Sequence, residues 1–212
     1  MLAADRRSLS SVRDAGEAWR AHVADSLTGL EVPELAAAGR IADVGAGAGF
    51  PGLVLAVALP DARVDLIESV GRKAAFIGEA AERAGIANAR PVSARAEDHA
   101  REPGPEGGRE AYDAVTARAV GRLSTLAELA SPLLRDGGVL VAWKGRRNPD
   151  EEDELERAAA QLAMEAEAVL EVGEAAGYEH RHLHVVRKAG PTPANLPRRA
   201  GLAKKRPYGA SR

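Results

Sequence analysis

The sequence predicts an α/β fold: a mostly parallel seven-stranded sheet with a terminal antiparallel strand and helices on both faces. From Arg40 onward, short apolar or β-branched runs alternate with alanine-rich stretches of helical period, which is the pattern of βαβ units. The last two runs are separated only by residues 173–181, which are too few for a crossover helix and include two glycines. A hairpin, and therefore one antiparallel strand, is expected there.

The expected strands are short β-branched or apolar runs. The expected strands span residues 40–44, 63–68, 89–92, 113–116, 138–143, 168–172 and 182–187. The expected helices span residues 52–58, 72–84, 123–134 and 152–164, and residues 8–29 form one or two amphipathic helices. The acidic run at residues 150–154 suits the start of the last of these helices, because carboxylates are favourable near a helix N-terminus.

Length and composition predict one globular domain with a short appendage at each end. The chain has 212 residues, of which 45% are hydrophobic and 28% charged, close to ordinary globular usage. We expect an N-terminal helical cap at residues 1–38, the α/β domain at 39–190 and a basic C-terminal segment at 191–212. Apolar runs such as residues 53–59 are far shorter than the roughly 20 residues of a membrane span, and no secretory leader opens the sequence. A monomeric cytoplasmic protein without membrane contact is predicted.

The charge is distributed unevenly along the chain. The net charge is −2, but residues 187–212 hold eight basic residues and no acidic ones, which leaves 21 basic against 31 acidic residues elsewhere. A basic tail on an acidic body suggests a polyanionic partner for the tail. Cysteine is absent, which excludes disulfides, zinc-thiolate sites and a catalytic thiol, and no metal site is predicted.

A glycine-rich loop follows the first expected strand, with the pattern Asp43-x-Gly45-x-Gly47-x-Gly49. Glycines let a ligand approach the backbone closely above the N-terminus of the next helix. A dinucleotide fingerprint needs glycine at its sixth position, where Phe50 stands. The spacing instead fits the first motif of Rossmann-like class I methyltransferases, in which Asp43 can help to orient an amino-acid moiety. The predicted cofactor is S-adenosylmethionine.

Two further segments are placed to contact an adenosine ligand. Glu68 ends the second expected strand, where a carboxylate can accept hydrogen bonds from ribose hydroxyls. Residues 93–98 follow the third, so that a backbone amide and an acidic side chain can read the adenine edge. Each signal alone is weak, since an acidic residue at a strand end is more often solvated; the conclusion rests on their combination with the loop.

Four segments resemble the bacterial ribosomal RNA small-subunit methyltransferase G family, also called glucose-inhibited division protein B. They are His22-x-x-Asp25-Ser-Leu, the Gly-Phe-Pro-Gly of residues 49–52, the Val-Thr-Ala-Arg-Ala of residues 115–119 with Lys144-Gly145, and the basic residues 196–207. The resemblance covers nearly the whole chain, and only the combination is specific. It implies that the substrate is 16S ribosomal RNA or the small subunit, methylated at N7 of a guanine in the decoding-region loop.

The resemblance also implies roles for particular residues. Cofactor contacts are carried over to Gly45, Phe50, Ala96, Glu97 and Arg118, beside Asp43, Gly47 and Glu68 from the motifs. For Arg118 a cofactor or phosphate role is favoured over simple pairing with a carboxylate, and for Lys144 substrate contact is weighed evenly against a solvated strand end. His22 and Asp25 are interpreted as a structural pair. The expected substrate-binding residues are Lys144, Arg198, Arg199, Lys204, Lys205 and Arg206.

No catalytic residue is predicted, because guanine N7 carries a lone pair and no proton and needs only to be positioned for attack on a methyl group. The absence of cysteine disfavours pyrimidine C5 methylation. Thr116-Ala117-Arg118-Ala119 stands where exocyclic-amine methyltransferases have Asn/Asp-Pro-Pro-Tyr/Phe. A 2′-hydroxyl target stays open.

Three other functions compete with this interpretation. They are a class I methyltransferase of a small molecule or protein, a non-enzymatic RNA-binding factor and, least favoured, a dehydrogenase. The basic segment itself could be a disordered tail. If it binds RNA, deletion of residues 196–212 is expected to abolish RNA methylation and to leave cofactor affinity largely intact.

Overall fold

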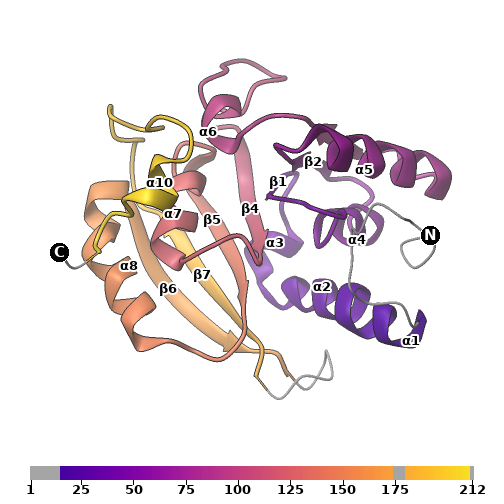
Figure 1. The fold of residues 1–212 in the computed structure, drawn as a ribbon, viewed down its shortest axis with the longest axis horizontal. Helices are drawn as coiled ribbons and strands as arrows, with labels where there is room; N and C mark the ends of the chain where they lie inside the picture. Colours follow the sequence, from indigo (N-terminus) through magenta and orange to yellow (C-terminus); the bar gives the residue numbers. More distant parts are fainter. Residues whose placement is uncertain (1–14, 174–179, 211–212) are drawn as a thin grey trace.

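One seven-stranded sheet forms the centre of the molecule in the computed structural model, which describes residues 15–173 and 180–210 (Figure 1). The strand order is β3-β2-β1-β4-β5-β7-β6, and β1 to β5 run parallel to one another. The strands are β1 (Arg40–Val44), β2 (Arg63–Ile67), β3 (Ala89–Val92), β4 (Tyr112–Arg118), β5 (Leu134–Lys144), β6 (Met164–Glu171) and β7 (His182–Lys188). The predicted fold class is confirmed.

The antiparallel strand is β7, which is inserted between β5 and β6 and runs antiparallel to both. The β6–β7 pair is the expected hairpin, and β6 rather than β7 forms the edge of the sheet. Because β7 runs in the opposite direction, its first residues lie at the same end of the sheet as the carboxyl ends of β4 and β5. Ligand sites of open α/β sheets are found at the carboxyl ends of the strands.

Helices cover both faces of the sheet (Figure 1). Along β5, Val139, Val141 and Trp143 point to one face and Leu140 and Ala142 to the other, as the two-residue period of a strand requires. One core includes residues of α3 (Pro33–Ala36), α4 (Gly52–Ala58) and α5 (Gly71–Ala84). The other includes residues of α6 (Ala96–His99), α7 (Leu123–Ala130) and α8 (Pro149–Leu162).

Two of these helix boundaries differ from those expected by three or more residues. Helix α7 ends at Ala130 rather than at residue 134, because Pro132 follows and Leu134 already begins β5. Helix α8 begins at Pro149, before the acidic run, because the Asn148 side chain accepts hydrogen bonds from the backbone N–H groups of Asp150 and Glu151. An Asn cap followed by proline is a strong helix start.

The N-terminal segment runs as short helical turns and is anchored on β5. It comprises α1 (Ala15–Ala18), η2 (Trp19–Ala24), α2 (Asp25–Leu27) and η3 (Thr28–Glu31), so the described part of the expected helices is helical, and residues 8–14 lie outside the described residues. The Trp143 indole N–H donates to the Asp25 carbonyl at 2.9 Å. A Cβ on Gly29 would lie 2.5 Å from the same indole ring. Small size at Gly29 therefore lets this segment lie close to the sheet.

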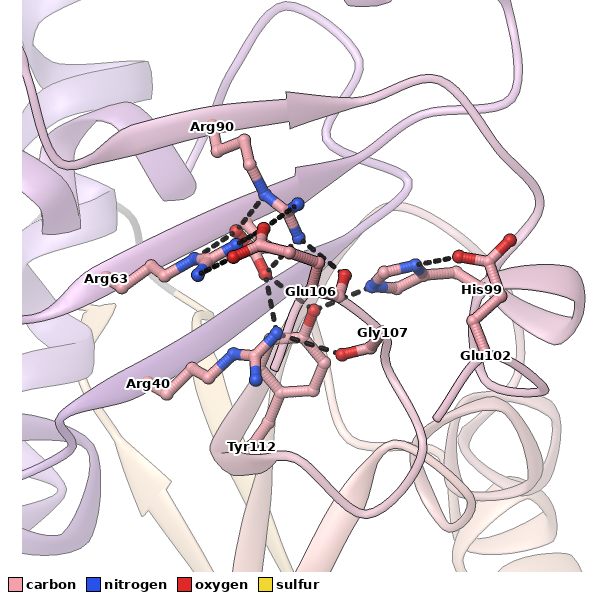
Figure 2. A network of polar contacts seen from close by, with 9 residues as sticks. Arg40, Arg63, Arg90, His99, Glu102, Glu106, Gly107 and Tyr112 are labelled. Carbon is pink, nitrogen blue, oxygen red and sulfur yellow. Dashed lines mark hydrogen bonds and ion pairs between the residues drawn. The ribbon is translucent and has the colours of Figure 1, made fainter. Parts of the chain in front are cut away.

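A cluster of arginines occupies the opposite edge, at the amino ends of the strands (Figure 2). Arg40, Arg63 and Arg90 converge on the buried carboxylate of Asp65, which also accepts a hydrogen bond from the Tyr112 hydroxyl at 2.8 Å. Burial by itself would raise the pKa of Asp65, but the hydrogen bonds from Arg90 and Tyr112 outweigh it and lower the pKa to about 2. These cations serve the fold at this edge.

The C-terminal segment packs onto the domain. Leu196 and Ala203 are buried, and α10 (Leu202–Lys205) lies against α7 (Figure 1). Arg101 and Arg109 donate to the carbonyl groups of residues 196–198. The part of this segment that the structure describes is thus an ordered element of the fold, which argues against the disordered-tail alternative.

Candidate functional site

The glycine loop turns at the carboxyl end of β1 through residues with positive φ. Gly45, Gly47 and Gly49 have φ of 70°, 58° and 98°, a region that glycine enters without steric cost. A Cβ on Gly45 would lie 2.7 Å from Cγ2 of Val120, whereas one on Gly47 would meet only the Gly45 carbonyl oxygen at 3.8 Å. The loop is packed at Gly45 and open at Gly47. An open, glycine-lined face is what a cofactor lying against this backbone requires.

Asp43 supports the loop from beneath. Its side chain is buried, with Oδ2 accepting a hydrogen bond from the Gly52 N–H and Oδ1 one from the Thr116 hydroxyl, each at 3.0 Å. Burial raises the pKa of Asp43 to about 6. The carboxylate therefore ties the loop and the start of α4 to β4, and direct orientation of a ligand by Asp43 stays a prediction.

Glu68 follows β2 and faces the same loop. Its carboxylate accepts hydrogen bonds from the Gly47 N–H at 3.0 Å and the Val70 N–H at 2.8 Å. A carboxylate offers about four acceptor positions, so these two bonds leave capacity for a pair of ribose hydroxyls. The residues present fit the adenosine end of S-adenosylmethionine.

Ala96 and Glu97 begin α6, after β3, and both are buried. Glu97 Oε1 accepts a hydrogen bond from the backbone N–H of Gly201 at 2.6 Å. No local signal in the sequence indicates this contact, which joins the third predicted cofactor segment to the basic C-terminal segment.

Phe50, His22 and Arg118 meet at the side of the loop that faces β4. The rings of His22 and Phe50 are stacked, with centroids 4.8 Å apart and an interplanar angle of 15°, and the Arg118 guanidinium lies 5.8 Å from the Phe50 centroid. Arg118 Nη1 also donates to Asp25 Oδ2 at 2.6 Å. Arg118 thus pairs with a carboxylate, which is the alternative role considered in the sequence analysis. It also lies beside the glycine loop.

A cavity of about 460 Å³ opens next to these residues. It is lined by Ala21, His22, Arg118, Ala119, Gly121, Leu126, Trp143, Lys144, Gly145 and Arg181. Lys144 thus lines a cavity, as substrate contact would require, while its ammonium pairs with Glu151 at 2.8 Å. Arg181 was missed from the sequence, because it reaches the site only through the insertion of β7 beside β5, and no local spacing signals that insertion.

The basic C-terminal residues fall into two groups. Arg198 is paired with the buried carboxylate of Glu128, with Nε donating to Oε1 at 2.6 Å, and it covers the Tyr208 ring at 4.1 Å. Arg198 is thus held within the fold. In the described part of this segment, the exposed cations are Arg199, Lys204, Lys205 and Arg206.

Comparison with known proteins decides the family. A sequence model of rRNA small subunit methyltransferase G matches residues 1–184. The chain belongs to this family. Two relatives named ribosomal RNA small subunit methyltransferase G, from Rubrobacter xylanophilus and Roseiflexus castenholzii, are 44% and 42% identical to it. The first alignment covers 98% of this chain and 80% of the relative, and the second 95% and 84%.

Solved structures show the same fold. An S-adenosylmethionine-dependent methyltransferase from Aquifex aeolicus superposes with a TM-score of 0.58 over 82% of this chain and 94% of that one, at 17% identity. A predicted O-methyltransferase from Agrobacterium tumefaciens gives 0.57 over 79% and 81%, at 24% identity. The predicted family, the class I methyltransferase fold and an S-adenosylmethionine-dependent rRNA methyltransferase activity are confirmed. Within the described residues, no helix is long and apolar enough to cross a membrane.

Proposed function

We propose that this chain methylates N7 of a guanine in the decoding-region loop of 16S ribosomal RNA and acts as a cytoplasmic monomer. The observation that carries the proposal is the position of the cationic cavity: it adjoins the glycine loop at the carboxyl edge of the sheet, in a chain of this family. A polyanionic acceptor fits cations beside a methyl-donor site. The choice of guanine and of its position in the RNA rests on the family resemblance.

Three segments would hold the cofactor, which supplies an electrophilic methyl group on a sulfonium. Gly47 presents open backbone, and Glu68 has acceptor capacity left for hydroxyls. In this proposal Glu97 reads the adenine edge, and Asp43 holds the loop in place through its hydrogen bonds to Gly52 and Thr116. Gly45, Phe50, Ala96 and Arg118 complete the proposed set of contacts.

On the RNA side, the reaction needs a correctly positioned guanine rather than acid–base catalysis. Guanine N7 attacks through its lone pair, so the chain's task is to bring the base into line and to exclude water. Burial, and next the charge of Arg118, lower the pKa of His22, which keeps its ring neutral and stacked on Phe50. In the proposed organisation of the chain, residues 1–38 help to line the site that receives the guanine. Residues 39–190 bind the cofactor, and residues 191–212 bind RNA.

The deciding experiment supplies labelled S-adenosylmethionine with either small ribosomal subunits or naked 16S RNA. We expect label in the RNA that becomes labile to alkali and borohydride, as N7-methylguanosine does. Unlabelled RNA, or label at another base atom, would overturn the proposal. Labelling of a small molecule or protein instead would favour the competing methyltransferase class.

A further inference from the structure

The cavity beside the glycine loop is lined by cations from three different elements. Arg118 ends β4, Lys144 ends β5 and Arg181 immediately precedes β7. Among the described residues that line it, none is acidic. Its walls also include the side chains of Ala119 and Leu126, so one part of the surface is apolar.

The carboxylates that pair with these cations lie outside the cavity lining. Asp25 is fully buried and does not line the cavity, yet its oxygens lie 2.6 Å from Arg118 Nη1 and 2.7 Å from Arg181 Nε. Lys144 pairs with Glu151. In these ion pairs, three cations of the lining are paired with two carboxylates among the described residues. Since burial and Arg118 lower the pKa of His22, His22 adds no charge at neutral pH.

The cavity is also close to the methyl-donor loop. Val120, two residues after Arg118, fills the space in which a Gly45 side chain would lie. The Phe50 ring packs near the Arg118 guanidinium. Whatever occupies the cavity therefore lies next to the loop that is proposed to hold the methyl donor.

We propose that this cavity is a phosphodiester subsite, which takes the RNA backbone phosphate adjoining the target guanosine through Arg181 and Lys144. Asp25 is the positioning residue that holds Arg118 and Arg181 in place. The inference rests on the proposed function, because it names the part of the RNA that this site receives.

Three properties favour a backbone phosphate. A phosphodiester is an anion, which a lining with three cations and no acidic residue among the described residues favours, and guanidinium forks suit phosphate oxygens. The volume lies in the range of about 300–1,000 Å³ of sites for ligands of nucleotide size. The competing anion, the carboxylate of the cofactor's amino-acid moiety, comes with an ammonium group that a cationic lining repels.

The test measures binding to small ribosomal subunits as well as turnover. In Arg181→Gln we expect subunit affinity to fall about tenfold and its salt dependence to weaken by about one unit of slope. The Kd for S-adenosylmethionine should stay within about twofold, since no cofactor contact is removed. Arg181→Lys should restore part of the affinity. Arg135→Gln removes an exposed cation paired with Asp113 at the far edge of the sheet, and it is the matched control.

Asp25→Asn separates positioning from charge. It makes the site one charge more positive, so charge alone predicts tighter RNA binding, whereas loss of the carboxylate that holds both arginines predicts weaker binding. We expect weaker binding. The measurement is made at a temperature at which thermal unfolding shows that the variant is folded.

Wild-type subunit affinity in Arg181→Gln would overturn the phosphate subsite. A parallel loss of S-adenosylmethionine affinity would also overturn it, by assigning the anion site to the cofactor's carboxylate. Because binding is read independently of turnover, an absence of methylation in the wild-type protein counts against the proposed function and leaves the binding result to decide this inference.

Discussion

The backbone N–H of Gly201 donates a 2.6 Å hydrogen bond to the carboxylate of Glu97, a buried residue of the proposed cofactor site. The C-terminal segment is therefore expected to support the proposed cofactor site as well as to supply charge. The Arg198 pair with Glu128 fastens the same segment to α7. Both contacts alter what removal of this segment should do.

Deletion of residues 196–212 is expected to lower cofactor affinity severalfold and to destabilise the fold. The deletion removes the donor to Glu97 and leaves the buried carboxylate of Glu128 without Arg198, and an unpaired buried charge costs about 3–5 kcal/mol. Calorimetry with S-adenosylmethionine and thermal unfolding measure the two effects. A truncated chain with full affinity and an unchanged melting temperature would restore the simpler expectation from the sequence, that this segment serves RNA alone.

Removal of two exposed charges tests RNA binding without that complication. Lys204→Gln/Lys205→Gln should weaken binding to the small subunit whatever the RNA sequence at the contact. It should also flatten the salt dependence of binding by about one unit of slope per lost phosphate contact. The melting temperature should not change, because both side chains are exposed. Arg83→Gln/Arg135→Gln removes the same charge at other exposed positions. Equal losses in the two variants would show that only net charge matters.

Gly45→Ala and Gly85→Ala separate backbone strain from crowding at the cofactor loop. The two glycines have φ of 70° and 67°, so each alanine should cost about 1 kcal/mol of strain. A Cβ at residue 85 meets nothing within 4 Å, whereas one at residue 45 would collide with Val120. We expect methylation and S-adenosylmethionine affinity to fall at least tenfold in Gly45→Ala only, as measured by calorimetry and turnover. Similar activities would mean that the loop tolerates movement of Val120.

Local signals predicted most of the fold. The bounds of β1, β3 and α4 agree with those expected, because apolar runs, helical period and flanking glycines are encoded within a few residues. The end of α7 was placed too late because apolar residues continue through Leu133 and Leu134, although Pro132 already ends the helix.

Only part of the candidate site could be predicted from the sequence, because contacts between residues far apart in the chain leave no local signal. The glycine loop and Glu68 follow strands directly, so their spacing is visible in the sequence. The partnership of Asp25 with Arg118 and Arg181 joins residues 93 and 156 positions apart, and Glu97 and Gly201 are separated by 104. With 29 basic and 31 acidic residues, many pairings are possible, and only the fold selects among them. The insertion of β7 beside β5 is what brings Arg181 to the cavity.

The arginine cluster around Asp65 predicts a specific loss of stability in acid (Figure 2). The pKa of Asp65 is about 2 in the folded chain and 3.8 without its partners, so the carboxylate contributes about 2 kcal/mol above pH 4. That contribution is lost as the pH falls from about 4 to about 2, because the folded state then has to take up the proton that the unfolded state already holds.

Asp65→Asn should therefore be about 2 kcal/mol less stable at pH 7, since it leaves the guanidinium groups without their central carboxylate, and it should lose less stability between pH 4 and pH 2. Urea unfolding at several pH values measures both effects. Glu106→Gln is the control, because Glu106 binds Arg63 and Arg90 from an exposed position, where solvent screens the interaction. If Glu106→Gln costs as much stability as Asp65→Asn, the arginines are held by the surface loop rather than by the buried carboxylate.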